Sequence, residues 1–275
     1  MSYHHVLNLE REPFSTSPDP SFLYLSEVHR TTLLRTEIAI RLKRGLSVIY
    51  GDIGTGKTTL SRKLFQSFAE EENVIFHMLL DPSHKTELQF LLSIARNMGI
   101  DTKTRSIVLL KELVEKYLFK KGVSQGKTVV LVIDEAQKLS LDCLEILRVL
   151  LNYETNEFKL LQVVLLGQLE LLPKMKKLPN FLDRICLKQF ISPLSEEDTK
   201  NMINFRLKKA NYCEKQPLFT PEAIKEIYTQ SGGYPRKVIF LCHNALEYII
   251  MQEKNMVDES VVREIVSREA NVLAC

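Results

Sequence analysis

Residues 46–59 read LSVIYGDIGTGKTT, a short apolar run that leads directly into a glycine-rich loop. Gly51, Gly56, Lys57 and Thr58 fill the spacing GxxxxGK[ST], and the amphipathic segment TTLSRKLFQSFAEE follows at 58–71. The loop therefore joins a predicted strand to a predicted helix, which is the context that this motif requires. We expect the loop to bind phosphate groups.

The chemistry of such a loop assigns a task to each part of the motif. Glycines let the backbone curl so that successive N–H groups point at phosphate oxygens, and the following helix adds the positive end of its dipole. Lys57 would reach the β and γ phosphates, and the Thr58 hydroxyl would bind Mg²⁺. An ordinary glycine-rich turn does not require this lysine and hydroxyl. The residues predicted to contact the nucleotide are Gly51, Asp52, Ile53, Gly54, Thr55, Gly56, Lys57, Thr58 and Thr59.

An apolar run ending in two carboxylates, TVVLVIDEAQKL at 128–139, forms the second chemical feature. The carboxyl ends of strands in an open α/β sheet line the ligand crevice, so Asp134 and Glu135 should face the phosphate loop. Asp134 suits Mg²⁺, which prefers oxygen ligands, and Glu135 could deprotonate an attacking water. Alone, the pair could be an acidic turn; beside a phosphate loop it predicts a metal ligand and a general base.

The acidic pair favours hydrolysis over transfer of phosphate to another substrate, because a glutamate after the metal-binding aspartate can activate water. The NKxD and DxxG motifs expected of a GTPase do not occur in the sequence. We therefore expect ATP, with Mg²⁺, as the ligand.

Three further polar positions could belong to the same site. LLQVVLLGQLEL at 160–171 ends a buried strand at Gln168, whose amide could position water, unless it is only a polar turn. FLDRICLKQF at 181–190 places Arg184 where it could reach a neighbouring subunit's nucleotide as an arginine finger, or form a surface salt bridge. In SGGYPRK at 231–237, Pro235 begins a helix and Arg236 lies in its first turn. A cation there opposes the helix dipole, so a phosphate is a natural partner.

Composition limits the class of protein. The chain has 275 residues, 45% of them hydrophobic, and 37 basic against 34 acidic residues give a net charge of only +3. The five cysteines, Cys143, Cys186, Cys213, Cys242 and Cys275, are scattered, which argues against a disulfide framework or a zinc site. No signal peptide or membrane-spanning run is recognisable, so we expect a cytoplasmic protein with reduced thiols.

Apolar runs at about 46–50, 74–80, 128–133, 160–166 and 186–191 alternate with helical patterns, which predicts an α/β fold with a parallel sheet. The first helix should run from Ser26 to Arg44, with Gly45 as its stop. After Pro193 every segment is predicted to be helical, with helix starts at Ser195, at TPEA 220–223 and at Asp258.

Taken in order, these motifs resemble the AAA+ ATPases, and within them the ExeA/GspA-like branch. The resemblance covers most of the chain and rests on FSTSPDPSFLYLSEVHR at 14–30, GDIGTGKTTLSR, VIDEAQ, LLGQLEL, LDRI, PLSEED and SGGYPRK. It implies a P-loop AAA+ core with a five-stranded parallel sheet, a C-terminal all-helical lid, and ATP-dependent assembly into a ring or filament. We accordingly expect residues 1–25 to pack near the nucleotide, 26–193 to form the core and 194–275 to form the lid.

The sequence departs from the family pattern in two places. Lys188 stands where the family usually has a second arginine, which leaves Arg184 as the finger. Longer secretion members continue into a membrane segment and a peptidoglycan-binding domain, whereas this sequence ends at Cys275. A secretion or pilus assembly protein is one partner that the resemblance implies.

Short relatives also resemble the TnsC/TniB-type transposition ATPases, which assemble on DNA and recruit a transposase. For this second hypothesis His84, Lys85, Lys103 and Arg105 could line a ring around duplex DNA. These four residues could equally belong to solvated loops.

Overall fold

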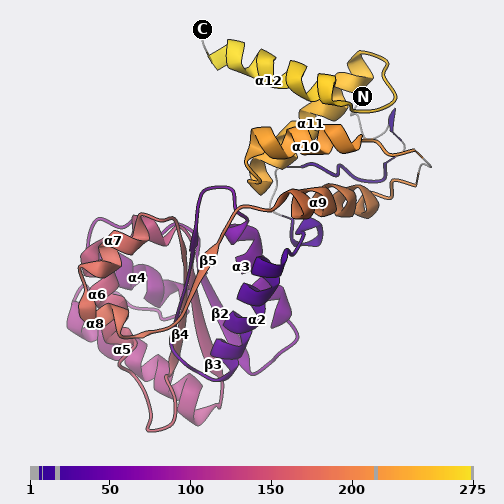
Figure 1. The fold of residues 1–275 in the computed structure, drawn as a ribbon. Helices are drawn as coiled ribbons and strands as arrows, with labels where there is room; N and C mark the ends of the chain where they lie inside the picture. Colours follow the sequence, from indigo (N-terminus) through magenta and orange to yellow (C-terminus); the bar gives the residue numbers. More distant parts are fainter. Residues whose placement is uncertain (1–5, 8, 16–18, 214–215, 274–275) are drawn as a thin grey trace. The chain divides into compact units, whose positions relative to one another are not determined.

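The computed structural model describes residues 6–7, 9–15, 19–213 and 216–273. The chain divides into two compact units (Figure 1). Unit 1 comprises Met1–Ser26, Gly54–Gly56 and Ser192–Cys275, and unit 2 comprises Glu27–Ile53 and Lys57–Ile191. All the strands of the described residues that form the sheet lie in unit 2.

Unit 2 is built on a five-stranded parallel sheet in the order β2-β3-β4-β1-β5. The strands are β1 (Leu46–Gly51), β2 (Val74–Leu79), β3 (Thr128–Ile133), β4 (Leu161–Gly167) and β5 (Ile185–Ile191). Each strand lies where an apolar run predicts it, and its first and last residues differ from the predicted ones by no more than one position. The predicted α/β fold with a five-stranded parallel sheet is therefore confirmed.

Burial along the strands follows their place in the sheet. Every residue of the central strands β3 and β4 is buried, which explains their unbroken apolar sequences. The edge strand β5 instead alternates between half-buried and exposed residues, and Lys188 and Phe190 lie on its exposed face. When an edge strand is covered on only one face, apolar residues are needed at every second position.

Helices cover both faces of the sheet in unit 2 (Figure 1). Leu33, Leu60 and Leu64 line the same small gap as Ile49 of β1 and Leu166 of β4, so the helices that carry these leucines share one face. The helical segments of unit 2 are α2 (Glu27–Arg41), α3 (Lys57–Ser67), α4 (Glu87–Asn97), α5 (Ile107–Phe119), η2 (Lys120–Ser124), η3 (Ala136–Lys138), α6 (Leu141–Leu150), α7 (Leu171–Lys176) and α8 (Pro179–Leu182).

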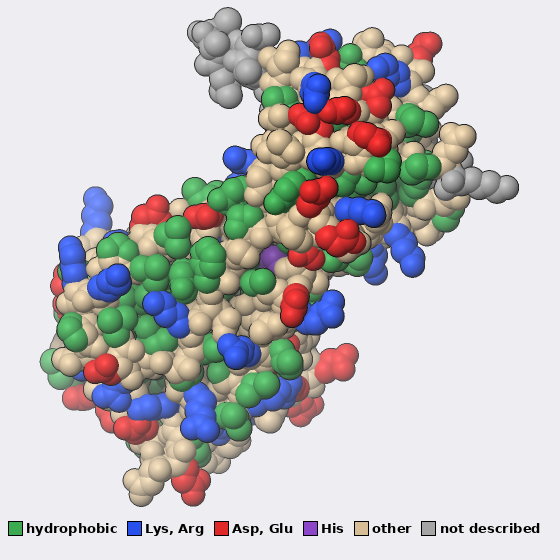
Figure 2. Space-filling model, viewed as in Figure 1, with side chains coloured by type: hydrophobic (Ala, Val, Ile, Leu, Met, Phe, Trp, Pro, Cys, Tyr) green, Lys and Arg blue, Asp and Glu red, His purple; other side chains and the backbone are tan. Residues whose placement is uncertain are grey.

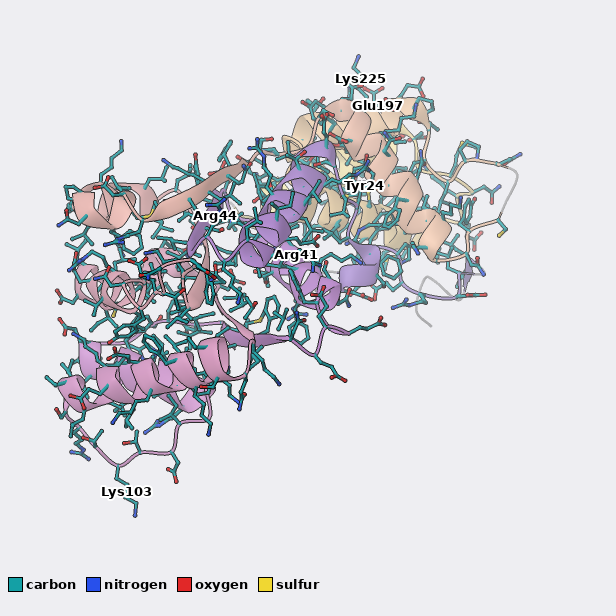
Figure 3. The ribbon with its side chains drawn as sticks, turned by 90° about the horizontal axis from the view of Figure 1, so that it is seen from below. Tyr24, Arg41, Arg44, Lys103, Glu197 and Lys225 are labelled. Atoms are coloured by element: carbon teal, nitrogen blue, oxygen red, sulfur yellow. The ribbon has the colours of Figure 1, made fainter. Side chains whose placement is uncertain are left out.

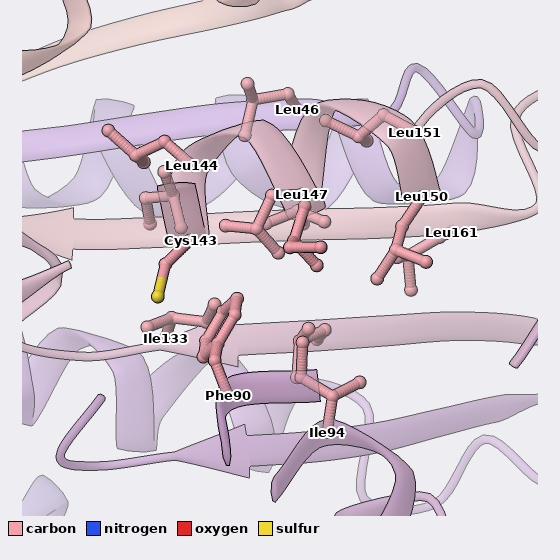
Figure 4. Packing of buried hydrophobic residues seen from close by; sticks show 14 of the residues in the cluster. Leu46, Phe90, Ile94, Ile133, Cys143, Leu144, Leu147, Leu150, Leu151 and Leu161 are labelled. Carbon is pink, nitrogen blue, oxygen red and sulfur yellow. The ribbon is translucent and has the colours of Figure 1, made fainter. Parts of the chain in front are cut away.

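The larger core of unit 2 lies on the other face, between the sheet and α4, α5 and α6. Phe90 and Ile94 of α4 lie opposite Leu147 of α6, and Ile133 and Cys143 lie beside them (Figure 4). These side chains are fully buried or nearly so. The core holds the carboxyl ends of β3 and β4 in fixed register, which matters because the predicted site follows those ends.

The end of α2 differs from the prediction that Gly45 stops the helix. The helix ends at Arg41, and Lys43 adopts a left-handed backbone with φ of 52°. The Lys43 N–H donates to the carbonyl of Ile40 (3.0 Å) and the Arg44 N–H to that of Ala39 (3.0 Å). This pair of bonds is a Schellman motif. A lysine therefore takes the place that glycine usually fills.

The helices of unit 1 begin where the sequence predicts. The Ser195 hydroxyl accepts from the Asp198 N–H (3.0 Å), Thr220 accepts from the Ala223 N–H (3.1 Å), and Asp258 accepts from the Val261 N–H (2.9 Å). Such side chains satisfy N–H groups that have no partner inside the helix. The helices of unit 1 whose bounds lie within the described residues are η1 (Pro20–Phe22), α9 (Glu196–Lys209), α10 (Pro221–Ser231), α11 (Pro235–Met251) and α12 (Glu259–Leu273).

The described part of the segment before α2 packs within unit 1. Phe14 is fully buried and meets the ring of Phe219 edge-on, with the ring centroids 5.8 Å apart. The Arg206 guanidinium donates to the carbonyl of Pro13 (2.8 Å), and the Tyr24 hydroxyl donates to Asp198 (3.0 Å). Residues 1–5, 8 and 16–18 of the predicted 1–25 segment lie outside the described residues.

The face seen in Figure 2 carries side chains of both charges, in keeping with the small net charge of the chain. Among their helices none combines the length and hydrophobicity that crossing a membrane needs. The cysteines Cys143, Cys186, Cys213 and Cys242 are free thiols, and Cys275 lies outside the described residues.

Candidate functional site

The phosphate loop follows β1 and ends in α3. Gly54 and Gly56 have φ of 82° and 95°, a region that side chains with a Cβ rarely adopt. The Lys57 side chain is buried, and its ammonium donates to the carbonyls of Gly51 (2.9 Å) and Asp52 (2.7 Å). Thr55 is fully buried, Ile53 is exposed and Thr59 is half-buried in α3. The loop thus has the curled backbone that the motif predicts.

The structure brings Thr58 and Asp134 together at the carboxyl edge of the sheet. The Thr58 hydroxyl donates to one oxygen of Asp134 (2.7 Å), and the Glu135 N–H donates to the other (2.9 Å). Asp134 is only 3% exposed. Residues 76 positions apart in the sequence therefore meet because β3 and β1 both end at this edge.

Glu135 and Gln168 also meet there. The Gln168 side-chain amide lies 3.5 Å from a carboxylate oxygen of Glu135, at the limit of a hydrogen bond. Glu135 itself has φ of 53°, a left-handed backbone that is uncommon for a glutamate. The predicted general base and the predicted water-positioning amide thus share one corner of unit 2, after β3 and β4.

Gln137 belongs to this corner too, and our sequence interpretation missed it. Its Nε2 donates to Glu135 (2.6 Å), and its Oε1 accepts from the N–H of Gln168 (3.0 Å). The Lys174 ammonium donates to the Gln137 carbonyl (2.5 Å). The only sequence signal was an amide two residues after a predicted base, too common a pattern to single out.

Burial opposes both charges at the centre of the site. Burial is the largest influence on Lys57 and lowers its pKa, although the charges of Glu135 and Asp134 act in the opposite direction. Burial likewise raises the pKa of Asp134, while the hydrogen bond from Thr58 lowers it. Each group is thus pushed toward its neutral form. A bound phosphate would stabilise the lysine, and a divalent cation would stabilise the aspartate.

The donor set fits Mg²⁺ held together with a nucleotide. Thr58 and Asp134 supply hard oxygen ligands from adjacent positions, and Mg²⁺ is typically held by one or two protein oxygens plus phosphates and water. Within the described ranges no group of three or more His, Cys, Asp or Glu side chains is arranged to hold a metal by itself. Gly54 also has little room for a side chain, because a Cβ there would lie 3.0 Å from the Arg236 side chain.

Arg184 is not brought to this site within its own unit. Ile185 pairs with Leu46, the first residue of β1, whereas the phosphate loop follows the last residue of β1. Arg184 therefore lies roughly 17 Å along the strands from the loop. Arg184 is half-buried, and no ion pair to it is found within the described residues. Its positive charge contributes, after burial, to a lowered pKa of Lys159.

Pro235 and Arg236 begin α11, as predicted. The Arg236 N–H donates to the carbonyl of Gly54 (3.2 Å), a contact inside unit 1 because Gly54–Gly56 belong to that unit. Arg236 is exposed as a residue. Gly232 and Gly233 form the preceding turn with φ of 61° and 74°.

The basic residues of the DNA hypothesis differ in exposure. Lys85, Lys103 and Arg105 are exposed, and Lys103 points away from unit 2 at the connection between α4 and α5 (Figure 3). His84 is instead half-buried; its ring centroid lies 5.9 Å from that of Phe90, and its Nε2 is buried. His84 therefore offers less of its side chain to a partner than the other three residues do.

Comparisons with known proteins show which sequences and folds this chain is similar to. Residues 40–175 match the family model described as AAA domain. The chain is 37% identical over 247 residues to General secretion pathway protein A of Aeromonas hydrophila, an alignment that covers 89% of this chain and 44% of that protein. The chain thus spans less than half the length of the curated relatives that it matches.

Solved structures share the fold at low sequence identity. The ORC2 protein of Aeropyrum pernix has a TM-score of 0.65 and 16% identity, covering 94% of this chain and 71% of that one. The Drosophila ORC bound to DNA has a TM-score of 0.66 and 21% identity, covering 94% of this chain and 64% of that one. At these identities the likeness concerns the fold alone.

Proposed function

The chain belongs to the AAA+ ATPases and is related to General secretion pathway protein A, and from this premise we propose that it binds ATP with Mg²⁺ and hydrolyses it at interfaces between subunits. The contact between Thr58 and Asp134 (2.7 Å), with Lys57 buried beside them, carries the proposal. Hydrolysis would drive assembly or remodelling of a partner complex, as in a secretion or pilus assembly system.

Each residue of the site takes one part of this function. Lys57 would leave the loop carbonyls that it now contacts and bind the β and γ phosphates. Thr58 and Asp134 would hold Mg²⁺, which when bound neutralises charge on the phosphates. Glu135 would take a proton from the attacking water, and the Gln168 amide would orient that water.

Residues from elsewhere in the chain would complete the site. Arg184 lies too far from its own phosphate loop to act there, which supports a role at the site of a neighbouring subunit. Arg236, exposed in the first turn of α11, would bind a phosphate, and Pro235 would fix the start of that helix. We further propose that the 1–25 segment forms part of the nucleotide's surroundings.

A second candidate function is an ATP-dependent DNA-binding scaffold of a transposition system. It is favoured by Lys85, Lys103 and Arg105, which are exposed and have no ion pair within the described residues. Duplex binding that requires ATP and weakens steeply with salt would support this candidate, because lysines that contact DNA phosphates release counterions. Replacing one such lysine should reduce the salt slope by roughly one.

Two substitutions test the primary proposal. Lys57→Ala should abolish ATP binding because the phosphates lose their main cationic partner. Glu135→Gln should retain ATP binding while turnover falls by about a hundredfold or more, because the amide cannot accept the proton from water. Isothermal titration would measure binding, and phosphate release would measure turnover.

An exposed lysine, Lys103, provides the control for these two substitutions. Lys103→Ala changes a charge of the same sign far from the phosphate loop and should leave both quantities unchanged in the absence of DNA. Turnover of Glu135→Gln at the wild-type rate would show that Glu135 is not the base, and tight ATP binding by Lys57→Ala would contradict the assignment of the phosphate loop.

A further inference from the structure

We propose that Gln137 is a positioning residue for the base, which holds the carboxylate of Glu135 and ties it to the end of β4. The inference rests on the proposed function, because it needs Glu135 to act as the base. The Gln137 side chain contacts both partners: its Nε2 lies 2.6 Å from Glu135 Oε2, and its Oε1 lies 3.0 Å from the backbone nitrogen of Gln168.

The identity of these partners fixes the orientation of the amide. A carboxylate can only accept a hydrogen bond, and a backbone N–H can only donate one. The opposite orientation of the Gln137 amide would bring donor against donor and acceptor against acceptor. Both ends of the side chain are therefore needed, and the 2.6 Å contact with Glu135 is a charge-assisted hydrogen bond, which is stronger than one between neutral groups.

The turn that carries Glu135 and Gln137 depends on contacts outside itself. Glu135 has a left-handed backbone, a conformation that is unfavourable for a residue with a Cβ and that neighbours must support. Lys174 of α7 supplies support by donating to the carbonyls of Gln137 (2.5 Å) and Leu139 (2.9 Å). The position of the base is thus set by α7 and β4 as well as by β3.

The end of β4 comes close to the turn because residue 167 is glycine. A Cβ on Gly167 would lie 2.9 Å from Leu171 and 3.3 Å from the backbone nitrogen of Gln137. This close approach lets the N–H of Gln168 reach Gln137. The side chain of Gln168 also lies near Glu135, so the base and the proposed water-positioning amide are joined through Gln137.

Two substitutions of Gln137 distinguish its hydrogen bond to the base, Glu135, from its hydrogen bond to the end of β4. Gln137→Met keeps the length of the side chain but removes both hydrogen bonds. Gln137→Glu keeps an acceptor for the Gln168 N–H but places a second carboxylate against Glu135. If Gln137 positions the base, kcat for ATP should fall in Gln137→Met by about tenfold or more and fall further in Gln137→Glu. Binding of ATP should stay within about twofold, because the hydrogen bonds of the Gln137 side chain go to Glu135 and Gln168 and not to Lys57 or Thr58.

Gln162 of β4 provides a matched control. It also uses both ends of its amide, but both partners are backbone groups, one just before β1 and one just before β4: it accepts from the Gly45 N–H (2.7 Å) and donates to the Lys159 carbonyl (2.8 Å). Gln162→Met should lower the melting temperature while kcat per folded molecule stays near the wild-type value. Gln137→Met should show the reverse, with a small change in melting temperature and a large change in kcat.

The Glu135→Gln background completes the test. There Gln137→Met should change the residual turnover by less than about twofold, since no carboxylate base remains to be positioned. Three results would overturn the inference: wild-type kcat in Gln137→Met, a higher kcat in Gln137→Glu than in Gln137→Met, or an equal fold-loss in both backgrounds. Wild-type turnover by Glu135→Gln itself would instead remove the proposed base, so the two failures are distinguishable.

Discussion

Single residues with unusual backbones shape both the site and the start of α11. Glu135 adopts a left-handed conformation at the end of β3, and Gly232 and Gly233 adopt it before α11. For a glutamate this conformation is unfavourable, so its neighbours must compensate, whereas a glycine adopts it without steric conflict. Backbone strain is therefore present at the proposed base, Glu135, and absent from the glycine turn before α11.

Gly232 and Gly233 make a matched pair for a stability test. A Cβ on Gly233 would lie 2.1 Å from the backbone oxygen of Leu194, while a Cβ on Gly232 would meet only the Tyr234 ring at 3.6 Å. Gly233→Ala should therefore lower the free energy of unfolding by about 3 kcal/mol or more, because backbone atoms must move. Gly232→Ala should cost only about 1 kcal/mol, for the left-handed backbone alone. Urea denaturation measures both, and equal losses would contradict the crowding argument.

Among the elements, the edge strand β2 contains a buried histidine. His77 is 8% exposed and shares a hydrogen bond with the hydroxyl of Tyr117 on α5 (3.0 Å). Burial lowers the pKa of His77 from its usual 6.5. At pH below 6.5 the unfolded chain binds a proton that the folded chain resists, so stability falls as the pH falls below that value.

We expect this histidine to make unit 2 sensitive to mild acid. Between pH 6.5 and the lowered folded pKa, the free energy of unfolding should fall by up to about 1.4 kcal/mol per pH unit. His77→Gln should remove this contribution, whereas Tyr117→Phe keeps the buried imidazole and should retain it. Urea denaturation at pH 7.5 and 5.5 would measure the difference, and identical pH slopes for the wild type and His77→Gln would show that His77 does not cause the effect.

The sequence predicts elements well where local chemistry decides them. The five strands and the caps at Ser195, Thr220 and Asp258 depend on short patterns and are confirmed. The predicted end of α2 was wrong because a residue other than glycine can adopt the left-handed conformation when its neighbours permit it, as Lys43 does. Gln137 escaped prediction because its contact spans 31 residues and requires Gly167 to bring β4 close.

For the whole molecule, the proposed function needs more than one copy of the chain. Arg184 stands beside the start of β1, and the phosphate loop follows the end of that strand. Since roughly 17 Å of strand separates them, an arginine side chain cannot span the distance within one chain. A head-to-tail interface, which generates rings or filaments, would bring the Arg184 of one copy to the site of the next.

Mixing two inactive variants tests this arrangement. Arg184→Ala keeps the base and lacks the finger, and Glu135→Gln keeps the finger and lacks the base, so each alone should turn over slowly. In an equal mixture about a quarter of head-to-tail interfaces join an intact base to an intact finger. Phosphate release should therefore recover toward about a quarter of the wild-type rate if the sites act independently.

Lys188 supplies the control for this experiment. Its ammonium lies 5.5 Å from the centre of the Tyr50 ring in the same chain, so Lys188→Ala should hydrolyse ATP by itself. Turnover per subunit should also rise with protein concentration in the wild type, because dilution separates the base from the finger. Cross-linking of differently labelled variants establishes that they mix. If such mixed assemblies stay as inactive as either variant, Arg184 does not act on a neighbour, and the interface that completes the site must present another cation.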